Sequence, residues 1–134
     1  MYTDGGSILY SFPSLDWGNS VSERFGIMPP KDKRGTLIDY GIQGVTETFS
    51  GAITISVGTA ADADAYGEEF DLGAATAATD LQGKTVRSVG GTIAALDLII
   101  VNPNLPANTP VVVTMVGAAG AGIGTPVCEI KWSN

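Results

Sequence analysis

The feature that most constrains the fold is the alternation of apolar and polar residues over short runs bounded by glycine or proline. In the clearest run, Ile53–Val57, the three branched apolar residues alternate with Thr54 and Ser56, which is the period of a strand with one buried face. The other expected strands are Thr36–Ile42, Val45–Phe49, Thr85–Val89, Leu96–Val101, Val111–Val116 and Val127–Trp132. No long helical pattern interrupts them, so the sequence predicts an all-β antiparallel sandwich.

Composition agrees with one domain built from short strands. The chain has 134 residues, of which 44% are apolar and 16% charged, enough for a single sizeable core. Its 18 glycines and 7 prolines are spread along the chain without a repeat, which suits many turns. We therefore expect a β-sandwich domain over residues 35–134.

The N-terminal segment, residues 1–34, lacks this regular alternation and allows two interpretations. It is either an irregular arm or, at Ile8–Phe12 and Val21–Ile27, a set of edge strands of the same domain. Trp17 lies in a polar, loop-like context, so it either anchors the chain on a partner protein or packs under its own loop.

The charge balance argues against nucleic acid and anionic membranes as partners. The net charge is −7 and the pI about 4.2, whereas phosphate binding depends on clustered cations. The one cluster, Lys31, Lys33 and Arg34, is interrupted by Asp32. No apolar run reaches membrane-spanning length and the N-terminus has no secretory pattern, so we expect a soluble protein made in a cytoplasm.

The residues that most enzymes use are scarce. The chain has no histidine, and Cys128 is its single cysteine, so histidine-based catalysis, intramolecular disulfides and thiol-rich metal sites are excluded. Glu68 and Glu69 are adjacent, and in a regular strand they would point to opposite faces. We expect no catalytic residue, no cofactor and no metal ligand set.

Three weaker patterns each have a functional and a structural interpretation. The acidic stretch 62–71 offers oxygen ligands for Ca²⁺, or it is a solvated acidic turn in which Asp62 caps a short helix, with one helical turn expected at Ala61–Tyr66. The glycines of residues 117–124 indicate a mobile hairpin tip and not a phosphate loop. Trp17, Tyr40 and Tyr66 would suit sugar stacking, whereas Trp132 shares a strand face with core residues.

Residues 45–66 and 68–87 resemble small head-decoration, or capsid cement, proteins of tailed bacteriophages. The resemblance rests on a strand ending in an aromatic, an ITISVGT strand, a DADAY acidic segment and a later acidic-leucine element. The matching residues are Phe49, Ile53, Ile55, Val57, Gly58, Thr59, Asp62, Asp64, Tyr66, Asp71, Leu72, Asp80 and Leu81. Residues 1–40 match no such pattern, and the glycine-alanine tip near the C-terminus departs from it.

The resemblance implies a jelly-roll-like sandwich that binds the major capsid protein on the outside of an icosahedral shell, across capsomer junctions. It further implies a homo-oligomer located on the virion, with a trimer favoured and a dimer possible. The candidate interface residues are Trp17, Phe25, Lys31, Lys33 and Arg34. Two alternatives remain open: a glycan-binding or host-adhesion module, and another virion component such as a tail or head-completion protein.

Overall fold

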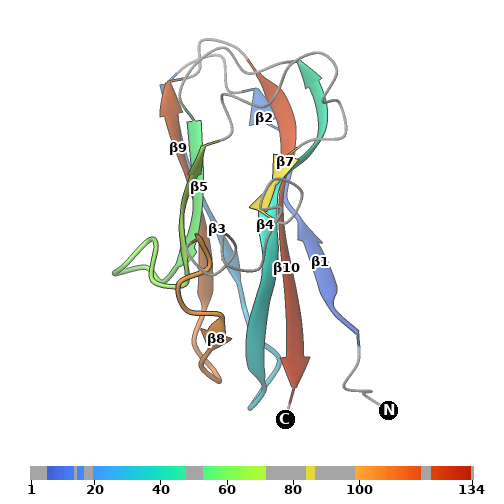
Figure 1. Ribbon diagram of the computed structural model, residues 1–134, viewed down its shortest axis with the longest axis vertical. Coiled ribbons are helices and arrows are strands. Elements are labelled where there is room, and N and C mark those ends of the chain that lie inside the picture. Colours follow the sequence, from blue (N-terminus) through green and yellow to red (C-terminus); the bar gives the residue numbers. More distant parts are fainter. Residues whose placement is uncertain are drawn as a thin grey trace.

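The computed structural model describes residues 6–13, 15–16, 20–47, 53–71, 84–86, 99–118 and 122–133. These residues form an all-β protein of two antiparallel sheets (Figure 1). Sheet A contains β1 (Ile8–Ser11), β2 (Leu15–Asp16), β4 (Arg34–Glu47), β7 (Lys84–Thr85), β8 (Asn104–Leu105) and β10 (Ile123–Ser133). Sheet B contains β3 (Ser20–Ile27), β5 (Ile53–Gly58), β6 (Gly67–Asp71) and β9 (Val111–Ala118). The expected antiparallel sandwich is thereby confirmed.

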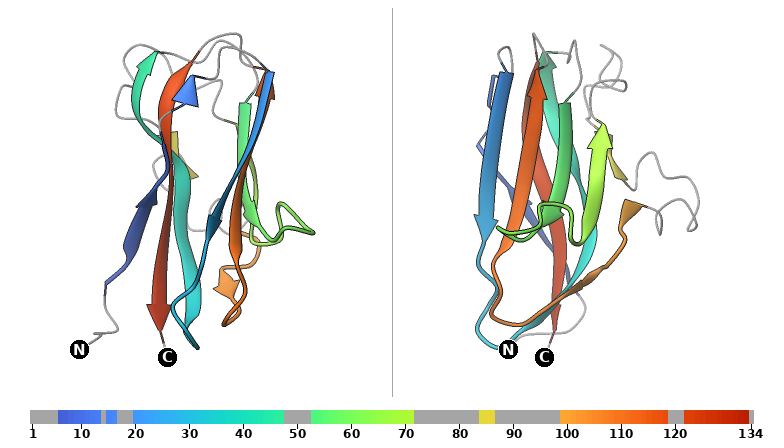
Figure 2. Two further views of the ribbon diagram at one scale, coloured as in Figure 1. Left: turned by 180° about the vertical axis from the view of Figure 1, so that it is seen from behind. Right: turned by 90° about the vertical axis from the view of Figure 1, so that its left-hand side faces the viewer.

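The strands pair in a nested order. Sheet A runs β1-β10-β4-β7, with β2 also pairing with β10 and β8 also pairing with β4. Sheet B runs β3-β9-β5-β6. Early strands therefore pair with late ones: β1 with β10, β3 with β9, β4 with β7 and β8, and β5 with β6. Figure 2 shows the two sheets stacked face to face.

The core lies between the sheets and comes from the alternating positions that the sequence predicts. On β5 the inward residues Ile53, Ile55 and Val57 are fully buried. On β10 the inward residues are Cys128, Ile130 and Trp132, each at most 1% exposed. The Trp132 indole N–H donates a hydrogen bond to the Tyr10 hydroxyl at 2.7 Å, which satisfies a buried donor and ties β1 to β10.

The described strands of the N-terminal segment belong to the sandwich, which agrees with the second of the two interpretations, that of edge strands. β1 lies at one edge of sheet A and β3 at one edge of sheet B. Phe12, just after β1, stacks on Phe25 of β3 with ring centroids 4.7 Å apart, and both rings pack against the core. The two aromatic rings thus bridge the sheets on the side of the sandwich where β1 and β3 lie.

Several strand boundaries differ from the sequence-based expectation. The two strands expected at Thr36–Ile42 and Val45–Phe49 are described as one strand, β4. Gly44, between them, adopts a left-handed φ of 58°, and β4 stays paired with β10 on both sides of a register shift there. Residues 99–101 are not in a strand, although Leu96–Val101 was expected to form one; residues 96–98 lie outside the described part. Ala61–Tyr66 is a turn-rich loop and not a helical turn.

Tyr40 crosses the core from sheet A to sheet B and needs a glycine opposite it. Its side chain is fully buried, and its hydroxyl donates to the Glu68 carbonyl oxygen at 2.5 Å. A Cβ on Gly67 would lie 2.6 to 2.8 Å from the Tyr40 ring and hydroxyl. The pairing of β5 with β6 is irregular here, and Glu68 and Glu69 are both exposed. The register shift means that the alternation of a regular ladder does not apply to Glu68 and Glu69.

Candidate interaction surface

One end of the sandwich gathers cations and exposed apolar side chains. The connection from β3 to β4 crosses between the sheets there, at the lower end in Figure 1. Lys31 and Arg34 are exposed and Lys33 is half-buried, so three of the seven Lys and Arg residues lie within four positions. Met28, at the start of this connection, is 73% exposed. We call the surface of residues 28–34 the basic end.

The basic end is held in one conformation by a second connection. A backbone hydrogen bond from Lys33 N to Pro30 O, 3.1 Å, closes a turn in which Asp32 has a φ of 60°. Asp32 and Asn108 exchange two hydrogen bonds, from Asp32 N to Asn108 Oδ1 and from Asn108 Nδ2 to Asp32 Oδ1, each 2.9 Å. Asn108 also has a left-handed φ, 56°, a conformation that Asp and Asn tolerate better than most residues. Two connections between the sheets are therefore joined, which preorganises the surface.

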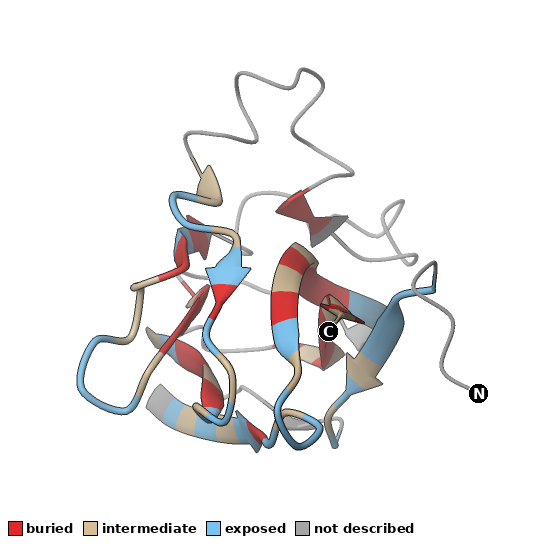
Figure 3. Cartoon of the chain, turned by 90° about the horizontal axis from the view of Figure 1, so that it is seen from below, coloured by how far each residue is buried: buried red, intermediate tan, exposed pale blue. Residues whose placement is uncertain are grey.

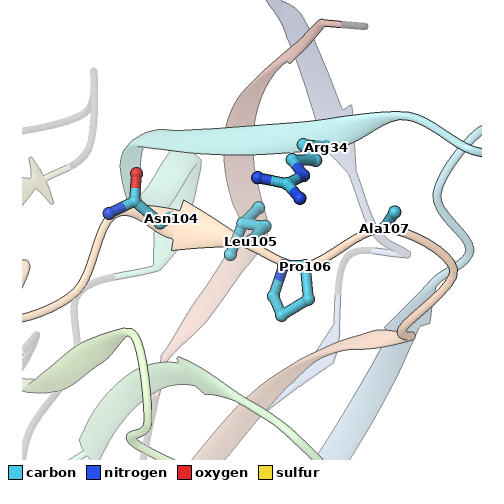
Figure 4. Close-up of a pocket in the computed structure, with 5 residues that line it drawn as sticks. All are labelled: Arg34, Asn104, Leu105, Pro106 and Ala107. Atoms are coloured by element: carbon cyan, nitrogen blue, oxygen red, sulfur yellow. The ribbon is translucent and has the colours of Figure 1, made fainter.

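A hollow of about 350 Å³ opens beside Arg34 (Figure 4). Its lining is mostly apolar and comprises Arg34, Asn104, Leu105, Pro106 and Ala107. β8 pairs with the start of β4, with Leu105 opposite Gly35, and this pairing sets the β8 side chains beside Arg34. Leu105 is buried and Pro106 exposed, so the described lining of the hollow combines an apolar wall with the Arg34 guanidinium and the Asn104 amide. That combination accepts a small apolar group together with an anion.

An acidic loop, residues 59–66, connects β5 to β6 and projects from the outer side of sheet B (Figures 1 and 2). Its first turn is closed by two hydrogen bonds, from Thr59 N to Asp62 O at 2.8 Å and from Asp62 N to Thr59 Oγ1 at 3.0 Å. Ala60, Ala61 and Asp62 are exposed. The loop therefore presents two methyl groups and a carboxylate on a hydrogen-bonded turn.

The carboxylates of this loop lie close enough to act on one another. A hydrogen bond with Asp62 is the largest cause that raises the pKa of Asp64, followed by desolvation and the charges of Glu68 and Asp62. Within the described ranges, no group of three or more His, Cys, Asp or Glu side chains is placed to hold a metal ion. The described part of this stretch is a turn-rich loop followed by β6, with Asp62, Glu68 and Glu69 exposed.

The predicted interface residues separate into three groups. Trp17 lies outside the described residues. Phe25 stacks on Phe12 and packs against the core, which is a structural role. Lys31, Lys33 and Arg34 come together on the basic end. The neighbouring hollow was not among the predicted sites, although the prolines of residues 102–110 indicate a stiff connection there.

The aromatic platform expected for a glycan-binding module does not form from Tyr40 and Tyr66, because both side chains are buried. Trp132 is buried as predicted. Cys128 is fully buried as well, and burial together with the nearby Asp39 and Glu129 raises the pKa of its thiol far above the usual value. A buried neutral thiol is a poor nucleophile.

Two further findings complete the description. Among the described residues, no helix has the length and apolar character needed to span a bilayer. No family model, curated protein or solved structure matches this chain.

Proposed function

We propose that this protein is a virion structural protein that decorates and stabilises the outside of an icosahedral phage capsid by binding the major capsid protein across capsomer junctions. It acts by binding and not by catalysis. Each bound copy stabilises the assembled shell by mass action, because it binds the assembled state in preference to its parts.

The strand order supports a jelly roll as the architecture. In a jelly roll, an antiparallel ribbon of eight strands is rolled so that its first strand pairs with its last and two four-stranded sheets face each other. The nested pairs β1 with β10, β3 with β9 and β5 with β6 follow that scheme, with the short β7 and β8 sharing the remaining place beside β4. Viral capsid and lectin domains use this architecture, which agrees with the resemblance of residues 45–87 to head-decoration proteins.

The basic end is the observation that carries the binding role. In a chain of net charge −7, cations are concentrated at one end of the sandwich, beside an exposed methionine and on a turn that is joined to a second connection. Interfaces are built from apolar anchors with charged rims that select the partner. We therefore assign capsid attachment to Met28, Lys31 and Lys33.

The test is a shell-binding experiment with purified protein. Capsids that lack this chain are mixed with wild-type protein or with the Lys31→Glu/Lys33→Glu variant, and bound protein is measured by co-sedimentation. We expect saturable binding of the wild-type protein and a loss of roughly tenfold or more in affinity for the variant, since reversal of both charges removes the cations that the proposed interface uses.

Arg24→Glu is the matched control. Arg24 is an exposed cation on β3, outside the basic end, so its reversal should leave shell binding close to the wild-type value. Wild-type protein that does not bind shells at any concentration would refute the proposed function. Equal weakening by the control and the test variant would refute the role of the basic end.

A further inference from the structure

We propose that the acidic loop of one copy of this protein seats in the hollow beside Arg34 of a second copy, so that the chain associates with itself through two complementary surfaces. This inference concerns free protein and does not rest on the proposed function.

The hollow has the chemistry for such a loop. Leu105, Pro106 and Ala107 give it apolar walls, and Arg34 is its charged group (Figure 4). The two hydrogen bonds between Asp32 and Asn108 hold the β3–β4 and β8–β9 connections beside the hollow in place before anything binds. A preformed site loses little conformational entropy when it is occupied.

The acidic loop has the matching chemistry. Ala60 and Ala61 are exposed methyl groups for the apolar walls, and the exposed carboxylate of Asp62 follows directly for the guanidinium. The hydrogen bonds between Thr59 and Asp62 fix the turn, so the loop is as preorganised as the hollow. Arginine and carboxylate form the most geometrically specific charge pair available to proteins.

The end of the acidic loop lies beside the connection that leads to β8, because Asn102 N donates a hydrogen bond to Tyr66 O at 3.1 Å. The rest of the loop leans toward β3 in the side view of Figure 2, whereas β8, which carries the hollow, lies on the far side of β6. We therefore assign the contact to the loop of a different copy. Such a contact joins two unlike patches, which gives a reciprocal dimer or a ring where the contact closes and an open filament where it does not.

Charge also explains why the contact would be selective. The chain is acidic overall, so copies repel each other in most orientations. Arg34, Lys31 and Lys33 place three cations near the hollow, with Asp32 among them, and these cations attract the acidic loop. Salt should weaken the association, because both charged groups are exposed.

The experiment measures the self-association of the purified full chain by sedimentation equilibrium over a wide concentration range. We expect reversible association that weakens in high salt. Arg34→Glu and, separately, Asp62→Lys should each weaken association by about tenfold or more. Mixing the two variants should restore it, because the reversed hollow of one then matches the reversed loop of the other.

Two controls match the change in net charge. Arg24→Glu equals Arg34→Glu in charge, and Glu69→Lys equals Asp62→Lys; both control positions are exposed on sheet B outside the loop and the hollow. Asp62→Asn removes the charge while keeping a side chain that can hydrogen bond in the loop. The proposal is overturned if the wild-type protein is monomeric throughout, if the controls weaken association as much, or if mixing restores nothing. Any of these results leaves shell binding through Lys31 and Lys33 unaffected as a separate question.

Discussion

Replacing Gly67 by alanine tests the packing of the two sheets through Tyr40. The new methyl group would lie 2.6 Å from the Tyr40 ring, well inside normal contact. The ring cannot move aside easily, because it is fully buried and its hydroxyl is bonded to the Glu68 carbonyl. Overpacking of a core costs about 1–3 kcal/mol. Alanine also restricts the unfolded chain, which offsets about 0.4–1 kcal/mol of that loss.

Gly26→Ala is the matched control, since Gly26 also lies on an edge strand of sheet B and a methyl group there meets no atom within 4 Å. The unfolded-state gain is common to both variants, so the difference between them isolates the clash, about 1–3 kcal/mol. Urea denaturation measures both free energies of unfolding. In a Tyr40→Leu background the penalty of Gly67→Ala should shrink, because the clashing ring is gone. Equal stability of the two alanine variants would refute this account of the core.

Three further predictions follow from the same structure. Deleting residues 1–34 should prevent folding, because it removes β1, β3 and the Phe12–Phe25 stack; a folded truncated protein, judged by circular dichroism and gel filtration, would contradict their place in the sandwich. The Cys128 thiol should react with a maleimide only as fast as the protein unfolds, and fast labelling of the native protein would contradict its burial. Asp64→Asn should raise the free energy of unfolding at neutral pH, because the raised pKa of Asp64 means that its charged form is disfavoured in the folded state. This gain in stability should vanish as the pH falls below 3.8, the ordinary pKa of an aspartate, where the carboxyl is protonated in both states. A gain that persists in acid would contradict the raised pKa.

The strands that alternate cleanly could be predicted from the sequence because one face of each is buried. Ile53–Val57 and Val111–Val116 match β5 and β9 to within two residues at each end, since their inward positions are all large and apolar. β1 and β3 were harder, because edge strands keep more of their surface in solvent. Their alternation is diluted by exposed residues such as Leu9 and Arg24.

The candidate surface could be predicted only in part. The cations of the basic end are adjacent in sequence, so their proximity follows from chain connectivity. The hollow cannot be predicted in this way, because Arg34 and the other lining residues are about seventy positions apart in the sequence and meet only through the pairing of β4 with β8. The hydrogen bonds between Asp32 and Asn108 are likewise a product of the tertiary fold.

A cryo-electron microscopy map of the virion can show whether this sandwich is a decoration protein attached by its basic end. We expect density for the sandwich in many symmetric copies outside the icosahedral shell, with Met28, Lys31 and Lys33 facing the major capsid protein. Density at the tail or the head-completion position, or inside the shell, would contradict it.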